Sequence, residues 1–251
     1  MNAATIASVN PEASIMIVGD SGTHKTYFLS TIPGIFIYDF DRRMAIARGR
    51  NVLYRTFRDA PYGSRAISPD NGIYKWGEGY PRFLDHINYI GEQIDKGALP
   101  YQALGLDSMT TLAMLVKNYV QSGVSKTPKD SVTQPEWGQI MDLMEAVISQ
   151  VTAWPLLKIA TAHISRNENE NMGGTVEYMP YMPGKKLAPK LPVFFDEWWF
   201  STRDDKETDM IKKFKFITET KGMFKSAKTT YGVPDGSVAD WSAIGKYFTQ
   251  G

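Results

Sequence analysis

The sequence predicts an α/β fold in which helices flank a mostly parallel central sheet and antiparallel strands lie toward the C-terminus. Short apolar runs that are typical of buried strands alternate with longer stretches whose apolar residues recur at helical spacing. A glycine-rich turn separates the first strand from the first helix, and polar residues follow several later strands. This order of elements favours a parallel sheet covered by helices.

The first elements of the chain are short. A strand at 15–18 leads through the glycine-rich turn to a helix that begins at Lys25. A Pro33-Gly34 break leads to a second strand at 35–38, and a third apolar run follows at 52–54. The next stretch is rich in proline and glycine, which predicts a surface insertion.

The later elements include longer helices. Apolar residues at helical spacing predict helices at 83–94, 112–120 and 140–151. Further strands are expected at 103–106, 156–160, 197–201 and 214–217, the last two as an antiparallel pair. Burial of each apolar side chain contributes about 1.5–3 kcal/mol, so the helical stripes are expected to form the core rather than a cofactor site.

The composition is that of an ordinary globular protein. Of 251 residues, 43% are hydrophobic and 22% are charged, which argues against disorder, collagen and coiled coil. The net charge of +1 means that a nucleic-acid partner would need a local basic patch. The absence of cysteine excludes disulfides, thiolate zinc sites and cysteine nucleophiles. No apolar run approaches the ~18 residues that span a bilayer, so we expect a cytoplasmic protein with no membrane partner.

The segment after the first strand matches a phosphate-binding loop. It consists of Gly19, Asp20, Ser21, Gly22, Thr23, His24, Lys25 and Thr26, and Tyr27 continues the expected nucleotide-binding segment. In the pattern GxxxxGK[ST], backbone amides surround the β-phosphate, the lysine reaches the terminal phosphates and the hydroxyl binds Mg²⁺. We therefore expect a nucleoside triphosphate and Mg²⁺ here. The alternative is a turn that only joins a strand to a helix.

His24 departs from this pattern, which has a second glycine at the same position. Glycine allows a positive φ and a close approach of the ligand. Histidine is among the few residues with a side chain that enter the left-handed region with any frequency. The departure is therefore compatible with a phosphate loop, and Gly22 can supply further flexibility.

An aspartate follows the strand at 103–106. In open α/β sheets, ligands bind at the carboxyl ends of the strands, so Asp107 lies beside the phosphate loop if its strand neighbours the first one. Together with Thr26, it is our candidate for the Mg²⁺ site. The alternative is that Asp107 or Ser108 caps the helix that follows.

Two acids close the second strand in the same way. Asp39 or Asp41 could polarise an attacking water, which requires a carboxylate within about 3 Å of that water. Alternatively, the acids belong to a surface turn in which Arg42 and Arg43 screen them. His163 ends another strand, where a polar side chain could sense the γ-phosphate. These strand ends and the loop would then meet in one crevice.

The order of these parts resembles the RecA core. A phosphate loop, an acid two residues past the second strand, an apolar strand ending in Asp-Ser and a polar residue on a later strand follow one another. More narrowly, the chain resembles the phage and prophage RecA-like single-strand annealing ATPases of the Sak group, within the AAA-like phage nucleotide-binding proteins. The resemblance covers about 14–231 and implies a RecA-like P-loop NTPase core.

The resemblance also implies roles for particular residues. It implies ATP and Mg²⁺ as cofactors, with Lys25 in the catalytic machinery. Asp41 lies where the family's catalytic acid, a glutamate in RecA, activates water, and its shorter side chain implies slow hydrolysis. Asp107 and Ser108 lie on the Walker B strand. His163 takes the position of the switch residue that couples nucleotide state to DNA.

The segment after His163 interleaves basic and aromatic residues. Its candidates for DNA binding are Arg166, Tyr178, Tyr181, Lys185, Lys186 and Lys190. Basic groups contact phosphates and rings stack on bases for ~1–3 kcal/mol each, which suits single-stranded DNA. In RecA-like proteins the corresponding segment is a mobile DNA-binding loop. The alternative is a solvated surface loop.

RecA-like ATPases bind nucleotide between subunits, and a basic residue of the neighbour reaches the γ-phosphate. The resemblance puts this residue at Lys221, with Lys225 and Lys228 as alternatives. It therefore implies a homo-oligomer, either a ring or a filament, with a single-strand-binding protein as a further candidate partner. Without the resemblance, these lysines belong to an exposed hairpin.

Together, these expectations describe an ATPase that binds single-stranded DNA and promotes ATP-dependent annealing or strand pairing in phage recombination. Its hydrolysis is expected to be slow and stimulated by DNA. The alternatives are a P-loop small-molecule kinase, which needs an arginine-rich lid, and a nucleotide-binding module without turnover. We expect a flexible N-terminal segment at 1–13, the ATPase domain at 14–231 and a C-terminal extension at 232–251 that packs on the core.

Overall fold

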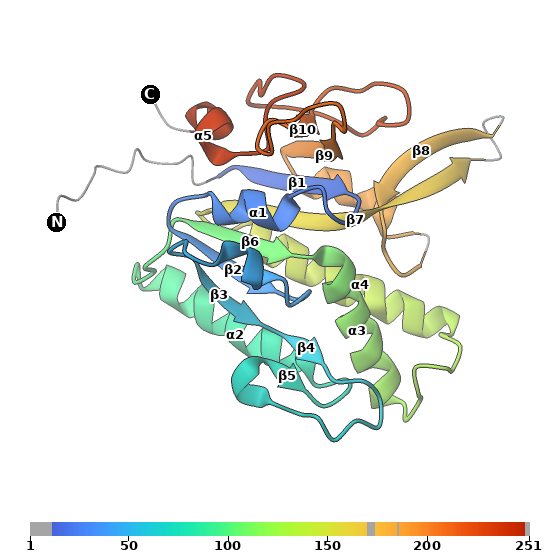
Figure 1. Ribbon diagram of the computed structural model, residues 1–251. Helices are drawn as coiled ribbons and strands as arrows, with labels where there is room; N and C mark the ends of the chain where they lie inside the picture. The colour runs from blue at the N-terminus through green and yellow to red at the C-terminus, as the bar shows by residue number, and fades with distance from the viewer. Residues whose placement is uncertain (1–11, 170–173, 185, 249–251) are drawn as a thin grey trace.

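An eight-stranded sheet lies at the centre of the described part of the chain (Figure 1). The computed structural model describes residues 12–169, 174–184 and 186–248. The sheet consists of β1 (Ser14–Gly19), β2 (Ile35–Asp39), β3 (Leu53–Thr56), β6 (Ala103–Asp107), β7 (Leu157–Asn169), β8 (Thr175–Pro180), β9 (Glu197–Arg203) and β10 (Phe214–Ile217). Its order is β10-β9-β1-β7-β6-β2-β3, and β8 pairs with β7.

Most neighbouring strands of the sheet are parallel. β1 pairs with β7 on one side and with β9 on the other, and the pairs β7–β6, β6–β2 and β2–β3 are also parallel. β10 is antiparallel to β9, and β8 is antiparallel to β7. The predicted α/β fold with antiparallel strands toward the C-terminus is therefore confirmed.

Helices cover both faces of the sheet. The α-helices are α1 (Lys25–Ser30), α2 (Gly79–Asp95), α3 (Met109–Gly123), α4 (Gln134–Thr152) and α5 (Trp241–Ile244). Short 3₁₀ helices are η1 (Met44–Ala47), η2 (Pro69–Asn71), η4 (Ala188–Phe194) and η5 (Gly245–Tyr247). Figure 1 shows α1 on one face of the sheet and α2, α3 and α4 on the other.

The two faces of β1 explain its unbroken apolar sequence. Side chains alternate across a strand, so a strand covered on both faces is apolar at every position. Met16 and Val18 lie in the core cluster that contains the buried residues of α2, α3 and α4. Ile15 and Ile17 lie in the cluster that contains Phe28 of α1.

Side-chain caps fix the starts of the two helices that follow the predicted strand at 103–106. Ser108 caps α3, because its hydroxyl accepts a hydrogen bond from the Thr111 N–H at 3.4 Å. Thr133 and Glu136 form a capping box at the start of α4, in which the Glu136 carboxylate accepts from the Thr133 N–H at 2.7 Å. The helix cap is therefore Ser108, which leaves Asp107 for another role.

The segment after His163 differs from the loop that the sequence suggested. β7 continues to Asn169, beyond the expected end at 160, and pairs with β8 as a hairpin. This pairing satisfies backbone groups that a loop would leave to water. The proline-rich insertion also contains a short parallel pair, β4 (Arg58–Asp59) and β5 (Ile73–Tyr74).

The C-terminal segment packs on the face that carries α1. Trp241, Ile244 and Phe248 are buried in the same cluster as Ile15, and the Trp241 N–H donates to Thr31 Oγ1 at 2.9 Å. The domain boundaries near 13 and 231 stay predictions, and most of the N-terminal segment lies outside the described residues. Within the described ranges, no helix combines the length and the apolar character needed to cross a membrane.

Candidate nucleotide-binding site

A pocket of about 260 Å³ lies at the edge of the sheet where β1 and β6 end and where β7 passes at His163. The predicted residues that line it are Ser21, Gly22, Thr23, His24, Lys25, Thr26, Tyr27, Asp41, Asp107 and His163. Arg43 and Ile46 complete the lining. The predicted nucleotide, metal and catalytic residues therefore lie together, apart from Lys221 and two residues at the base of the loop.

Those two residues, Gly19 and Asp20, hold the loop in place. Their carbonyl oxygens each accept a hydrogen bond from Lys25 Nζ at 2.7 Å. A Cβ at Gly19 would lie 2.7 Å from the Ser201 carbonyl oxygen and 2.8 Å from Thr23 Oγ1, so glycine is needed at this position. The Ser201 hydroxyl donates to the Thr23 carbonyl and ties the loop to β9.

The backbone of the loop has the conformation expected of a phosphate loop despite the histidine. Gly22 has φ 81° and His24 has φ 64° and ψ 19°, both in the left-handed region. The His24 ring stacks on Phe214 of β10 with ring centroids 3.4 Å apart, and on Tyr27 at 4.9 Å. A glycine could not make these contacts. Burial of the ring and the nearby Arg203 cation lower the pKa of His24, which favours the neutral ring.

Lys25 is the buried cation of the pocket, with 7% of its surface exposed. Burial lowers its pKa to about 8, although the carboxylates of Asp107, Asp41 and Asp20 favour the charged form. The ammonium donates hydrogen bonds to two loop carbonyls. A triphosphate would offer it oxygens of opposite charge in place of these neutral acceptors.

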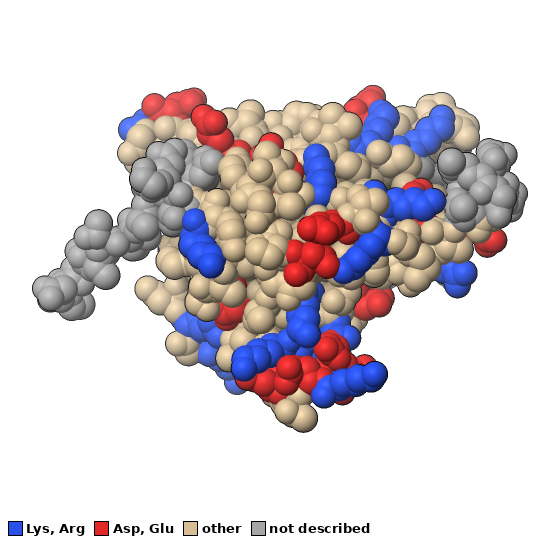
Figure 2. Space-filling view, turned by 90° about the horizontal axis from the view of Figure 1, so that it is seen from above, with Lys and Arg blue, Asp and Glu red and all other residues tan. Residues whose placement is uncertain are grey.

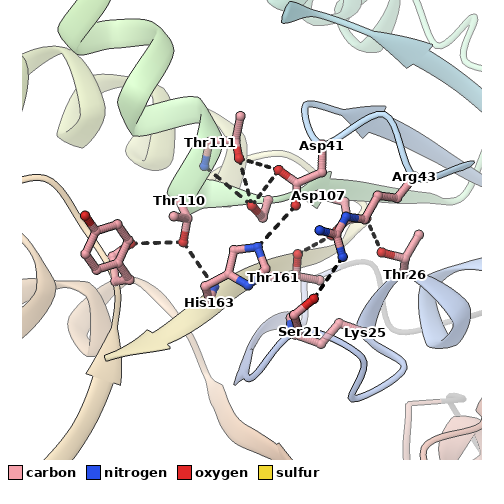
Figure 3. Close-up of polar contacts among 12 residues, drawn as sticks. Ser21, Lys25, Thr26, Asp41, Arg43, Asp107, Thr110, Thr111, Thr161 and His163 are labelled. Atoms are coloured by element: carbon pink, nitrogen blue, oxygen red, sulfur yellow. Dashed lines mark hydrogen bonds and ion pairs between the residues drawn. The ribbon is translucent and has the colours of Figure 1, made fainter. Parts of the chain in front are cut away.

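Thr26 and Asp107 meet at the predicted metal position. Thr26 Oγ1 donates to Asp107 Oδ2 at 2.6 Å, and the Thr161 hydroxyl donates to Asp107 Oδ1 (Figure 3). The expected condition, that β1 and β6 are neighbours, is wrong because β7 lies between them. Thr161 belongs to this intervening strand, and its side chain bridges the gap.

The chemistry of these groups fits Mg²⁺. Burial raises the pKa of Asp107, while hydrogen bonds from Thr161 and Thr26 oppose that change. Among the described residues, no group of three or more acidic, histidine or cysteine side chains could hold a metal alone. Mg²⁺ commonly binds through one or two protein carboxylates together with phosphate oxygens and waters. Thr26 and Asp107 are therefore the residues that would hold a nucleotide-bound Mg²⁺.

Asp41 is the acid that faces the pocket. Its Oδ1 accepts from Ser108 Oγ at 3.3 Å and from the Thr111 hydroxyl, and its Oδ2 lies 3.5 Å from His163 Nε2 (Figure 3). Burial opposes the ionisation of Asp41, but the hydrogen bonds from His163, Thr111 and Ser108 outweigh it and lower the pKa. The carboxylate is thus held charged, as a proton acceptor must be.

Asp39 lies outside this pocket. Its carboxylate accepts from Thr56 Oγ1 at 3.2 Å and from the Arg43 N–H at 3.1 Å. It lines a separate, larger pocket on the side of β3. Of the two acids that the sequence left as alternatives, Asp41 is therefore the one that lines the pocket of the phosphate loop.

His163 connects the pocket to the end of the hairpin. The backbone N–H of His163 donates to Thr110 Oγ1 at 3.0 Å, and Thr110 Oγ1 donates to the Tyr181 carbonyl at 2.9 Å. The Tyr181 N–H donates back to the His163 carbonyl at 2.6 Å. Thr110 and the Tyr181 backbone therefore form a closed set of hydrogen bonds with His163. Figure 3 shows the contact between Thr110 and His163.

The predicted DNA-binding residues are only partly brought together. Arg166 and Lys186 are exposed, and Tyr181 has 53% of its surface exposed. The Tyr178 ring packs against Phe224 with centroids 5.2 Å apart. Lys190 Nζ is paired with Glu145 at 2.6 Å, and Lys185 lies outside the described residues.

The lysine that was predicted to reach the nucleotide of a neighbouring subunit has an ion-pair partner within its own chain. Lys221 forms an ion pair with Asp235 and does not line the nucleotide pocket. Lys228 Nζ donates to the Pro192 carbonyl at 3.0 Å. A contact with the nucleotide of a neighbouring subunit would require Lys221 to leave Asp235, and its role stays a prediction.

Several side chains of the site were not predicted from the sequence: Thr110, Thr111, Thr161 and Phe214. A threonine on a strand or in a first helical turn has no distinctive pattern, so only the fold reveals its partners. Arg43 was interpreted as a screen for surface acids, yet its Nη1 donates to Ser21 Oγ at 3.0 Å across the pocket.

No curated protein matches this sequence. Among solved structures, one match is described as a prototypical ATPase from the type III secretion system of pathogenic bacteria, with 13% identity and a TM-score of 0.47. The match covers 83% of this chain and 60% of that one. A family model described as an AAA domain matches residues 11–232. The chain therefore belongs to this family of P-loop ATPase domains.

Proposed function

We propose that the protein is a RecA-like recombination ATPase that binds single-stranded DNA and promotes its ATP-dependent annealing in phage recombination. It acts as a homo-oligomer in the cytoplasm of the bacterial host. The observation that carries this proposal is the hydrogen-bonded link from Asp41 through His163 and Thr110 to Tyr181. It joins the nucleotide pocket to the end of the β7–β8 hairpin, the segment that we propose binds DNA.

The pocket residues support hydrolysis with each group in a defined role. Lys25 binds the terminal phosphates, and Thr26 and Asp107 would hold a Mg²⁺ ion, which would supply positive charge against the phosphate oxygens. Asp41 accepts a proton from the attacking water, because its lowered pKa keeps it charged. Its side chain is one methylene shorter than the glutamate of RecA, so hydrolysis is slow.

DNA binding is supported by the side chains near the hairpin. Tyr181 offers an exposed ring for base stacking, and Arg166 and Lys186 offer exposed charges for phosphates. Basic and acidic side chains are interspersed on the face seen in Figure 2. The affinity is therefore modest, and it falls with salt because each phosphate that a basic group neutralises releases condensed counterions.

Phosphate release with and without single-stranded DNA tests the function. We expect slow hydrolysis that DNA accelerates, and loss of both ATP binding and hydrolysis in Lys25→Ala. Annealing of complementary oligonucleotides should require ATP. The double variant Lys185→Ala, Lys186→Ala should bind DNA more weakly and with a flatter salt dependence. Hydrolysis that DNA does not change, together with no annealing, would refute the recombination function.

A small-molecule kinase is the second candidate, because a larger pocket lies on the other side of the turn after β2. This pocket has a volume of about 790 Å³, which is within the range of ligand sites. Its lining includes Arg42, Arg55, Tyr54 and the acids Asp39 and Asp70. An acceptor molecule held there would be phosphorylated at the expense of ATP, so labelled phosphate on an added acceptor would favour this function. ATP binding without any turnover would favour a module that only holds nucleotide.

A further inference from the structure

Arg43 reaches into the nucleotide pocket from the turn after β2. Its backbone N–H donates to Asp39 Oδ1 at 3.1 Å, which fixes the start of the side chain. Its guanidinium Nη1 donates to Ser21 Oγ at 3.0 Å, so the side chain spans the pocket to the phosphate loop (Figure 3). The guanidinium and the Lys25 ammonium therefore lie at one pocket.

Consecutive residues of this turn line different pockets. Asp41 and Arg43 line the nucleotide pocket, whereas Arg42 lines the larger pocket beside β3. Arg42 has φ 56°, in the left-handed region. Met44 follows Arg43, is buried and begins η1, which anchors the backbone next to the arginine. The orientation of Arg43 is thus set by the fold of the turn.

The Arg43 guanidinium has hydrogen-bond donors to spare in the pocket. It shares the pocket with the Lys25 ammonium and with the Asp41 and Asp107 carboxylates. Among the described residues, its side chain hydrogen-bonds the neutral Ser21 hydroxyl through Nη1. A guanidinium carries five N–H donors in a planar fork that matches phosphate oxygens. A polyphosphate would therefore accept hydrogen bonds from the donors that Ser21 leaves unused.

We propose that Arg43 is a catalytic residue that contacts the terminal phosphate of a triphosphate bound in the same subunit. This inference rests on the proposed nucleotide function. Negative charge on the transferred phosphoryl group is stabilised by a fixed cation, and an arginine supplied in cis is an effective one. Each subunit then supplies an arginine to its own nucleotide, in addition to any basic residue that a neighbouring subunit contributes.

The test compares Arg43→Ala with Arg48→Ala, a matched loss of charge at a nearby exposed arginine that lines neither pocket. Calorimetry with Mg²⁺ gives the affinities for ATP and ADP, and phosphate release gives kcat and KM. Arg43→Ala should lower ATP affinity by about tenfold, leave ADP affinity within about twofold, and lower kcat by about 100-fold or more. Arg43→Lys should recover part of both losses, because it restores the charge without the fork. Arg48→Ala should match the wild type in all of these measurements.

Thermal unfolding of each variant shows whether it is folded, and Arg43 is an exposed side chain whose loss leaves the core intact. Equal losses of ATP and ADP affinity in Arg43→Ala would overturn the inference, as would an unchanged ATP affinity. The same loss in Arg48→Ala would also overturn it. A wild-type protein that binds no triphosphate is a distinguishable result, since it would remove the proposed function as well.

Discussion

The Thr26 hydroxyl donates a 2.6 Å hydrogen bond to Asp107 Oδ2, although β7 separates the strand before Thr26 from the strand that carries Asp107. The two residues meet because parallel strands end at one edge of the sheet and α1 starts there. Thr161 of the intervening strand donates to the other carboxylate oxygen. A hydroxyl and a carboxylate at this distance form a pair that one cation can bind.

Replacing Thr26 with alanine should weaken Mg²⁺-dependent ATP binding. The substitution removes one expected oxygen ligand of the metal and one of the two hydroxyls that donate to Asp107. We expect metal affinity to fall by ~10- to 100-fold. Calorimetric titrations of ATP with and without Mg²⁺ measure how much the metal strengthens ATP binding in each variant. Thr26→Ser keeps the hydroxyl and should bind nearly as the wild type does. If Thr26→Ala responded to Mg²⁺ like the wild type, the metal assignment would be wrong.

The lowered pKa of Lys25 predicts a pH dependence of ATP binding. Its pKa is about 8 in the free protein, mainly because of burial. Phosphate charge favours the ammonium form, so bound ATP raises this pKa and binding takes up a proton above about pH 8. ATP affinity should therefore fall as the pH rises past 8. Calorimetry in buffers of different ionisation enthalpy measures the proton uptake, and an uptake near zero at pH 9 would contradict the prediction.

The same residue predicts the opposite trend for the stability of the free protein. Between about pH 8 and the ordinary lysine value of 10.5, the unfolded chain binds the Lys25 proton and the folded chain releases it. The contribution of Lys25 to the free energy of unfolding therefore rises with pH through this window. Lys25→Met lacks the titrating group and is the control. Parallel stability curves for the two proteins would show that the shift is absent.

Parallel strand ends made much of the site predictable. Asp107 ends β6, Asp41 follows β2 and His163 lies beside the end of β1. The loop motif defined the fourth part. The choice between Asp39 and Asp41 could not be made from the sequence, because both lie near the end of β2. It depends on the conformation of the turn, which directs Asp41 to one pocket and Asp39 to the other.

The hairpin was harder to predict than the parallel sheet. The residues past His163 are polar and basic, which is a composition typical of loops. The pairing of β7 with β8 joins residues that are not neighbours in the sequence, such as Ile164 and Pro180, so local patterns do not reveal it. Phe214 was expected only as part of a strand. Its stacking on His24 requires β10 to lie beside the phosphate loop, which is a consequence of the whole sheet order.

The His24 ring should contribute stability that partly offsets its backbone conformation. His24→Gly loses the contacts with Phe214 and Tyr27, worth ~0.5–1.5 kcal/mol each, but gains ~1–2 kcal/mol from relief of the left-handed backbone. His24→Ala loses the contacts and keeps the strain. Urea unfolding should therefore rank His24→Ala below His24→Gly by about 1 kcal/mol. The reverse order would contradict the role of the positive φ.

Asp41 and Asp39 offer a matched test of the proton acceptor. Asp41→Asn should lower kcat by about 10²- to 10⁴-fold and leave ATP affinity within a few-fold, since the amide cannot accept the proton. Asp39→Asn makes the same change of charge nearby, yet keeps an oxygen for the Arg43 N–H. Phosphate release under single-turnover conditions compares the two. Equal losses in both variants would show that Asp41 has no special part in the reaction.

Thr110 should control the response to DNA rather than hydrolysis itself. Its hydroxyl connects the His163 N–H to the Tyr181 carbonyl, and it does not line the nucleotide pocket. Thr110→Val keeps the shape of the side chain but leaves two backbone groups without this partner, at about 1–3 kcal/mol each if they stay buried. We expect basal phosphate release within about threefold of the wild type and little stimulation by single-stranded DNA.

The matched control for this variant is Thr110→Ser, which retains the hydroxyl and should retain the stimulation. Thermal unfolding of both variants separates a loss of coupling from a loss of folded protein. Because Tyr181 also donates its N–H to the His163 carbonyl, one direct backbone contact survives in Thr110→Val. Full DNA stimulation in a folded Thr110→Val protein would therefore mean that this direct contact, and not the threonine, carries the signal between hairpin and pocket.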